Sequence, residues 1–368
     1  MTVSMTDQRL RVYTQEEAAL RALRAYLLPA FTRETAAPNQ PLEDKALVET
    51  WEGYLAEAQE AGVYATLRKH WVQFQFPVAE GMSRSDSYRQ ATRRGASTQL
   101  MPEARGLALK APDKLKLSLH ASPAGRLPVL VAEERADFES IIQALCYRNE
   151  PRPVPASMGA ALIKGLNNWD RVRKLQARGG YTNLLAHKDL FQDSVIVLSR
   201  IPYSNVPAPA LGLEAESWLE QSLRIRLAHE GAHYFTLRRF GRMHVNMYDE
   251  LIADYAGIKA VQPHFRADWF LRFIGLEDYP RLRQTGRLNN YLGQPPLSGP
   301  ARQALQAILR DAALQVEAFD RQVQPEQAAK QPIPLLALCR HSLLEIAAPD
   351  GHAQLLQTFN DLQQAFTL

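Results

Sequence analysis

The chain has 368 residues, of which 46% are apolar and 22% are charged, and its formal net charge is +4. This composition is that of a globular protein with a substantial core, and it excludes collagen-like, coiled-coil and largely disordered chains. The positive charge is spread along the chain and no basic domain stands out, so a nucleic-acid partner is not expected.

The cysteines and the N-terminus favour a cytoplasmic protein. Cys146 and Cys339 lie far apart and form neither a CxxC pair nor a disulfide framework, which is typical of a reducing compartment. We expect both to be small buried residues. The first residues lack the apolar core of a secretory signal, and no run of about 18 apolar residues occurs, so a membrane partner is not expected.

The first part of the chain is predicted to be helical. Apolar residues recur at helical spacing from Glu16 to about Lys69. A short helix follows, with Ser83 or Ser85 able to cap its start and Gly95 able to end it. We expect residues 1–108 to form an N-terminal helical region, which offers a surface for a protein partner.

Strand patterns appear in the middle of the chain. Residues 114–120 alternate between polar and apolar types, and residues 127–133 follow after a short turn, which predicts a β-hairpin. Helices are predicted over residues 134–147 and 157–177, and a third strand over 194–200. The second of these helices holds the run NNWD in its interior, where Asn and Asp are unusual because they favour caps and turns.

The last part of the sequence is almost entirely helical. A helix is predicted from Glu214 to about Phe240, and the break after it contains Gly241, which can end a helix, and Asn246, which can start the next one. The expected fold class is α+β and predominantly helical. We expect residues 109–240 to form an α/β lobe and residues 241–368 to form a C-terminal helical lobe.

The helix predicted after Glu214 carries the sequence HEGAH, in which His229, Glu230 and His233 match HExxH. Residues four apart lie on the same helix face, so both imidazoles can bind one metal ion. The carboxylate beside the first histidine is rotated by about 100° and can reach a metal-bound water without binding the metal. Chance predicts only about 0.01 matches to this pattern in such a chain. The alternative is a pair of ordinary helix-face histidines.

A catalytic zinc site with three protein ligands needs one more donor. Glu250 lies 17 residues (250 − 233) after His233, on the next predicted helix. Asp254, one turn further along, can accept the free ring N–H of a ligand histidine. Asp249 can replace Glu250 by a one-residue shift, and His244 is another candidate, although the spacing HExxHxxGxxH is absent.

Several other polar side chains are candidates for lesser roles. The possible oxyanion stabilisers are Tyr203, His244, Tyr248 and Tyr255, each of which has ordinary packing as its alternative. The remaining histidines have no partner at ligand spacing, and we expect ordinary surface or core roles for His70, His120, His187, His264, His341 and His352.

HEGAH followed by ELIAD resembles the gluzincin type of zincin metallopeptidase, over about residues 213–260. In that family two histidines of HExxH and a Glu on the following helix bind zinc. The resemblance implies a zincin-like core with a small sheet, an active-site helix and a C-terminal helical lobe. It also implies that an edge strand, here residues 194–200, pairs with an extended peptide. The residues that it implies are the ligands His229, His233 and Glu250, the general base Glu230, and Asp254 as support for a ligand histidine.

These features together predict a zinc-dependent metallopeptidase with one Zn²⁺, in which Glu230 is the general base. Two alternatives stay open. One is a structural or regulatory metal site in a helical scaffold that binds a protein partner, which the long N-terminal helical region favours. The other is a metal-dependent amidase that acts on a small or modified peptide, because HExxH specifies the activation of water and not the substrate pocket.

Overall fold

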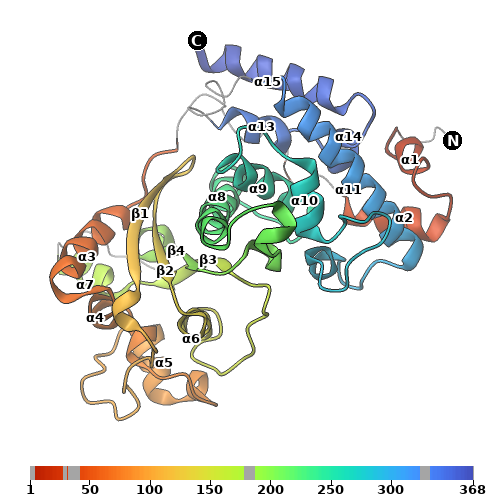
Figure 1. Cartoon of the computed structure of the whole chain (residues 1–368). Helices are drawn as coiled ribbons and strands as arrows, with labels where there is room; N and C mark the ends of the chain where they lie inside the picture. Colours follow the sequence, from red (N-terminus) through yellow and green to blue (C-terminus); the bar gives the residue numbers. More distant parts are fainter. Residues whose placement is uncertain (1–4, 28–30, 32–41, 178–186, 324–331, 368) are drawn as a thin grey trace. The chain divides into compact units, whose positions relative to one another are not determined.

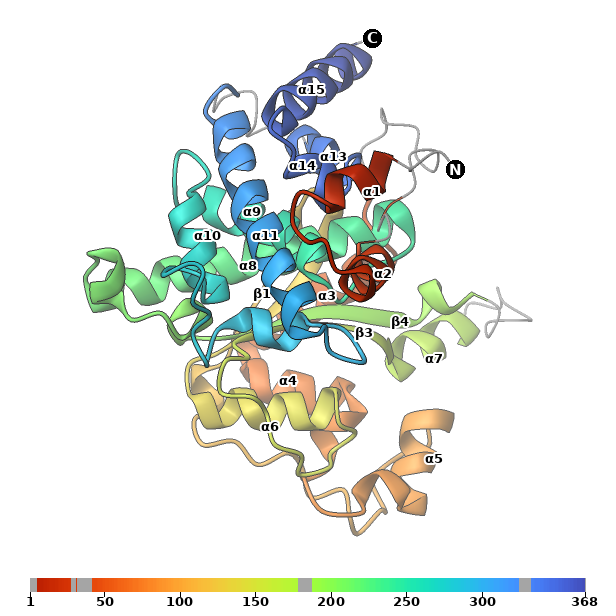
Figure 2. The same ribbon diagram turned by 90° about the vertical axis from the view of Figure 1, so that its right-hand side faces the viewer.

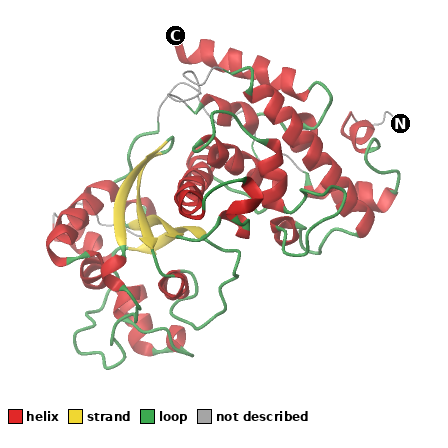
Figure 3. Ribbon diagram, viewed as in Figure 1, coloured by secondary structure: helices red, strands yellow, loops and turns green. Residues whose placement is uncertain are grey.

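The structure is a computed structural model that describes residues 5–27, 31, 42–177, 187–323 and 332–367 (Figure 1). Helices make up most of the described chain, and the strands form a single small sheet, as the colouring in Figure 3 shows. The expected α+β, predominantly helical fold class is therefore confirmed.

The chain forms two compact units. One combines residues 1–42 with residues 202–368, and the other is the continuous segment 43–201. The boundaries predicted after residues 108 and 240 both fall inside a unit. The predicted N-terminal helical region is shared between the two units, because its described residues before Glu43 belong to the unit of the C-terminal helices.

The segment 43–201 contains a four-stranded mixed sheet with the order β1-β2-β4-β3. The predicted hairpin is present as β1 (Lys116–Ser122) and β2 (Gly125–Ala132). The third predicted strand is β4 (Gln192–Ser199), which runs parallel to β2 and antiparallel to β3 (Ala160–Asn167). The expectation that residues 194–200 offer a free edge to a peptide is wrong, because β4 is paired on both sides.

The helix predicted over residues 157–177 is half wrong. Its first half is strand β3, and helix α7 begins at Trp169 and ends at Ala177. Asn168 lies at the junction, where its Oδ1 accepts a hydrogen bond from the backbone N–H of Arg171 at 3.0 Å. The short apolar run before Asn168 fits both the helical and the strand spacing of apolar residues. Its pairing with β4 makes this run a strand. The unusual NNWD run thus marks a helix start.

In addition to α7, four α-helices accompany the sheet among the described residues of this unit. Ser85 caps helix α5 (Asp86–Arg94), with its side chain accepting a hydrogen bond from the N–H of Tyr88. Gly95 ends this helix in the left-handed conformation, as predicted. One core cluster joins the sheet to aromatic side chains such as Trp51, Trp71 and Phe138. The helices are α3 (Leu47–Ala61), α4 (Val63–His70), α5 (Asp86–Arg94) and α6 (Arg135–Leu145).

The other unit is built from helices. Helix α11 packs against α2, α10, α14 and α15 (Figure 2). The described α-helices of this unit are α1 (Met5–Leu10), α2 (Glu17–Tyr26), α8 (Ala215–Phe240), α9 (Met247–Lys259), α10 (Ala267–Ile274), α11 (Gly299–Asp320), α13 (Ile333–Cys339), α14 (Leu343–Ile346) and α15 (Gly351–Thr367).

Helices α8 and α9 form the predicted helical corner. Gly241 ends α8 with a φ of 71°, and the side chain of Asn246 caps α9 by accepting the N–H of Asp249 at 3.1 Å. The two helices approach closely at Gly257, where an added Cβ would lie 3.0 Å from the carbonyl oxygen of Ile225. This close approach brings the polar faces of the two helices together.

Two smaller expectations have mixed outcomes. Cys339 is buried in α13, as expected, but Cys146 is exposed after α6. The two cysteines are free, in agreement with their spacing. Among the described residues, no helix has both the length and the apolar character to cross a membrane.

Candidate metal centre

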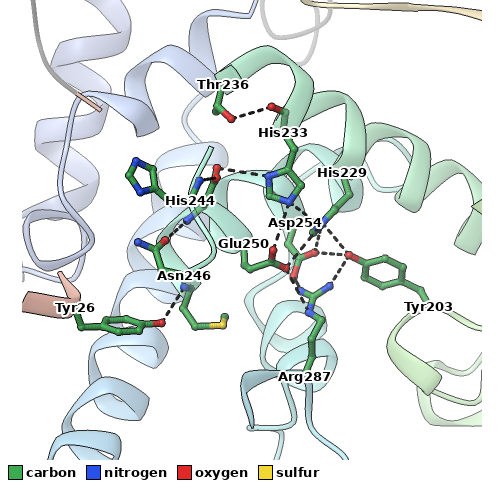
Figure 4. A network of polar contacts seen from close by, with 12 residues as sticks. Tyr26, Tyr203, His229, His233, Thr236, His244, Asn246, Glu250, Asp254 and Arg287 are labelled. Atoms are coloured by element: carbon green, nitrogen blue, oxygen red, sulfur yellow. Dashed lines mark hydrogen bonds and ion pairs between the residues drawn. The ribbon is translucent and has the colours of Figure 1, made fainter. Parts of the chain in front are cut away.

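Three predicted ligands converge between α8 and α9 (Figure 4). His229 and His233 lie one turn apart on α8, and their Nε2 atoms face each other at 3.2 Å. Glu250, in the first turn of α9, places Oε1 at 3.4 Å from Nε2 of His233 and Oε2 at 3.7 Å from Nε2 of His229. All three side chains are buried. Among the described residues, they are the one group of His, Cys, Asp or Glu with this ligand geometry.

The geometry of this group fits a small metal ion. Ligand atoms bound to tetrahedral zinc at 2.0–2.1 Å lie about 3.3 Å apart, and the observed separations are 3.2, 3.4 and 3.7 Å. Oε2 of Glu250 is buried and has no hydrogen-bond partner. Its ion-pair contacts, with Nε2 of His229 and Nε of Arg287, are both 3.7 Å long. A buried carboxylate oxygen without a hydrogen bond is costly unless a cation comes closer. These residues can therefore hold one divalent ion.

The surrounding charges also favour a cation. Asp249, Glu250 and Asp254 are buried, and the side chain of Arg287, 13% exposed, lies against two of them. Three carboxylates and one guanidinium leave a formal charge of −2 when both histidines are neutral, which a divalent ion would neutralise. Burial lowers the pKa of His233, but the nearby carboxylates of Asp249 and Glu250 outweigh burial and raise that pKa well above the usual value.

The carboxylates of the group are held in the ionised form that a ligand set requires. Burial raises the pKa of Glu250, but the nearby His229, His233 and Arg287 outweigh burial and lower this pKa. The same competition lowers the pKa of Asp254, where Arg287 is the main opposing charge.

Asp254 supports His229 as predicted. Its Oδ1 lies 2.9 Å from Nδ1 of His229, on the side of the ring away from Nε2. The hydroxyl of Tyr203 lies 2.6 Å from the same Oδ1 and 2.9 Å from the same Nδ1. Because the ionised carboxylate can only accept hydrogen bonds, this arrangement places the ring proton on Nδ1 and leaves Nε2 free.

Asp249 lies on the Nδ1 side of His233 but makes no hydrogen bond with that nitrogen. Its Oδ1 lies 3.6 Å from Nδ1 of that ring, and its Oδ2 accepts the backbone N–H of His244 at 2.6 Å. The Asp249 carboxylate therefore lies on the Nδ1 side, whereas Glu250 lies on the Nε2 side. This geometry favours Glu250 over Asp249 as the third ligand, and the sequence did not predict the contact between Asp249 and His233.

The predicted oxyanion stabilisers are mostly engaged elsewhere. The hydroxyl of Tyr248 donates to the carbonyl of Leu338 at 2.9 Å, and that of Tyr255 donates to Oδ1 of Asp320 at 2.6 Å. The ring of His244 lies edge-on to Phe31, with 5.7 Å between ring centroids. Packing is thus the better interpretation for these three. Tyr203 lies near the centre, but its hydroxyl is used on the Nδ1 side of His229.

A further segment at the site, the 3-10 helix η8 (Arg287–Tyr291), was not predicted from the sequence. Arg287 donates from one guanidinium nitrogen to the hydroxyl of Tyr203 at 2.7 Å and from another to Oδ2 of Asp254. Its Nε lies 3.7 Å from Oε2 of Glu250. No motif marks Arg287, which stands near two other arginines, Arg281 and Arg283.

Tyr291, at the end of η8, lies close to Glu250. Burial raises the pKa of Tyr291, and so do the charge of Glu250, a hydrogen bond with it and the charge of Glu230, whereas Arg287 lowers this pKa. The hydroxyl of Tyr291 is therefore a neighbour of the third predicted ligand. Tyr26 of α2 links η8 to the start of α9, because its hydroxyl donates to the carbonyl of Tyr291 at 2.7 Å and accepts the N–H of Met247 at 3.0 Å.

Most of the other histidines have contacts typical of ordinary residues. His70 lies 2.8 Å from a Glu57 oxygen and stacks on Tyr54. His120 is partly buried on β1, and His187 is exposed. Partners elsewhere in the fold contact the remaining three, namely His264, His341 and His352.

A family model matches residues 8–350 of the chain and carries the description "Family of unknown function (DUF7005)". The chain belongs to the DUF7005 family. The matched range includes the metal centre and η8, and the description of DUF7005 names no chemistry. No curated protein and no solved structure matches the chain.

Proposed function

We propose that the chain is a zinc-dependent metallopeptidase that hydrolyses a peptide or amide bond. The observation that supports this most strongly is the convergence of His229, His233 and Glu250 with their donor atoms 3.2–3.7 Å apart. Three protein ligands are the number found in catalytic zinc sites, whereas structural sites use four. The HExxH motif adds Glu230 at the position that a general base occupies.

The residues of the chain have separate parts in this proposal. A bound zinc ion would polarise the scissile carbonyl and make an attacking water more acidic at neutral pH. The carboxylate of Glu230 accepts the proton of the attacking water and passes it to the leaving nitrogen. Asp254 holds the ring of His229 through Nδ1, and the carboxylate of Asp249 faces Nδ1 of His233.

The alternatives make different demands on the same residues. A structural or regulatory site needs a fourth protein ligand, and the group found among the described residues has three. An amidase that acts on a small or modified peptide would use the same three ligands and the same base, so the choice of substrate separates it from a peptidase.

Replacement of the general base tests the proposal. Glu230→Gln is expected to keep zinc, measured as metal content, and to lose hydrolysis by about 10²- to 10⁴-fold, which is the usual contribution of a general base. The matched control is Glu220→Gln, an exposed position on the same helix. Both variants and the wild type would be assayed on fluorogenic peptides and on small amino-acid amides, with and without a chelator.

The outcomes are distinct. A wild type that a chelator inactivates, together with an inactive but zinc-containing Glu230→Gln variant, supports the proposal. Full activity in Glu230→Gln contradicts the role of this carboxylate. A wild type that binds zinc and hydrolyses neither substrate class contradicts the enzymatic function.

A further inference from the structure

Arg287 contacts three groups around the ligand His229: Tyr203 and Asp254 on the Nδ1 side of the ring and Glu250 on the Nε2 side. It donates to the hydroxyl of Tyr203 at 2.7 Å and to Oδ2 of Asp254, and its Nε lies 3.7 Å from Glu250. The side chain is 13% exposed. A guanidinium has five N–H donors and no acceptor, so Arg287 is the donor in both hydrogen bonds, and its contact with Glu250 is an ion pair without a hydrogen bond.

This one-way donation fixes the proton of Tyr203. Because the phenol oxygen accepts from Arg287, its own proton points to another partner, and Oδ1 of Asp254 is the nearest at 2.6 Å. Nδ1 of His229, 2.9 Å from both oxygens, must then carry the ring proton. Without Arg287, the phenol loses the donor that orients it and Asp254 loses its paired cation. The hydroxyl can then donate to Nδ1 in place of Oδ1, which would put the ring proton on Nε2 and block the metal-binding lone pair.

The backbone before Arg287 holds this side chain in place. Gly275 and Gly286 touch where the loop between them closes: a Cβ on Gly286 would lie 2.8 Å from the carbonyl oxygen of Ile274 and 2.9 Å from Cα of Gly275. The N–H of Arg283 donates to the carbonyl of Gly275 at 2.9 Å. The loop is therefore closed by its own backbone next to Arg287.

We propose that Arg287 is a positioning residue of the metal centre, which acts through the hydroxyl of Tyr203 to keep Nε2 of His229 free for the metal. This inference rests on the proposed metal site and assigns a role to a residue outside both ligand helices. The inference also predicts the direction in which metal affinity changes when Arg287 is replaced. A cation next to a metal ion repels it, so simple electrostatics predicts tighter metal binding when Arg287 is neutralised, whereas the positioning role predicts weaker binding.

Zinc affinity of the full chain, measured by competition with a chromophoric chelator, tests this direction. Arg287→Gln and Arg287→Lys are both expected to weaken zinc binding by about 10- to 100-fold, as is usual for residues that orient metal ligands. Arg287→Lys keeps the charge and loses the planar fork. The matched control Arg283→Gln, which removes an arginine from the same loop, is expected to change the affinity by less than about threefold.

A double-mutant cycle tests the route through Tyr203. In a chain that carries Tyr203→Phe, Asp254 alone sets the ring proton, so the further change Arg287→Lys is expected to cost much less than it does in the wild type. Gly286→Ala gives a second approach, since it displaces the backbone beside Arg287 without removing a polar group, and it is expected to weaken zinc binding as well. Circular dichroism of each variant would establish that it is folded.

Unchanged or tighter zinc binding in folded Arg287→Gln and Arg287→Lys variants would overturn the inference, and so would an equal loss with and without Tyr203→Phe. If Arg287→Gln does not fold, Arg287→Lys and Gly286→Ala decide the matter. Zinc affinity does not depend on hydrolysis, so a wild type that binds zinc without turnover contradicts only the proposed function. A wild type that does not bind zinc contradicts both.

Discussion

The contact between α8 and α9 at Gly257 makes a sharp prediction about the metal centre. A Cβ added there would lie 3.0 Å from both the carbonyl oxygen and Cγ2 of Ile225, and 3.7 Å from Cβ of His229. The carbonyl belongs to the backbone and cannot rotate away, so Gly257→Ala must push the two helices apart. Overpacking of this kind costs about 1–3 kcal/mol, while the better helix propensity of alanine returns up to about 1 kcal/mol.

We therefore expect Gly257→Ala to lower the free energy of unfolding, measured in urea, by about 0–2 kcal/mol. The matched control is Gly53→Ala in α3, where an added Cβ meets nothing within 4 Å, and this change is expected to stabilise by about 0.5–1 kcal/mol. Zinc binding should weaken only in Gly257→Ala, because α9 carries Glu250 and α8 carries the histidines. Equal stabilisation of the two variants with unchanged zinc affinity would refute the reasoning.

Two further predictions follow from side chains already described. His229→Ala is expected to lose bound zinc, whereas Tyr248→Phe, which removes a hydroxyl bonded to Leu338, is expected to retain it, as measured by metal content; zinc loss in Tyr248→Phe would show that this tyrosine belongs to the site. In the segment 43–201, burial lowers the pKa of His70, but hydrogen bonds to Asp170 and Glu57 outweigh burial and raise it above 6.5. Protonated His70 should therefore stabilise the folded state below about pH 6.5, and this contribution should disappear as the pH rises through the folded-state pKa. His70→Gln should weaken that pH dependence in urea unfolding, and an unchanged profile would contradict it.

The elements that were predictable from the sequence are those whose signals are local. Gly241 and Asn246 mark the ends of α8 and α9 through backbone conformation and capping, which depend on neighbouring residues alone. Strand β3 was predicted as helix because its short apolar run fits both periods, and its pairing with β4 is a contact between distant residues. The free edge expected at β4 failed for the same reason, since strand order does not follow from local pattern.

In the metal centre, too, the residues with local sequence signals were predictable and the others were not. HExxH and the Glu250–Asp254 pair lie on single helices, where spacing defines a face, so their convergence could be expected. Arg287 arrives from a loop that the contact of Gly275 with Gly286 closes, and no spacing relates it to His229. Its role becomes visible only through the hydroxyl of Tyr203, which lies in yet another segment.

The first turn of α9 explains why Asp249 and Glu250 could not be distinguished as ligands from their order alone. Adjacent residues on a helix differ by about 100° in direction, so only one of them can reach the Nε2 side. The cap decides which one: Asn246 fixes where α9 begins, and the N–H of His244 holds Oδ2 of Asp249 toward the preceding turn. Glu250 is thereby directed to the two Nε2 atoms, and Asp249 is left beside Nδ1 of His233. One helix thus places Glu250 on the Nε2 side of both histidines and one further carboxylate on the Nδ1 side of each.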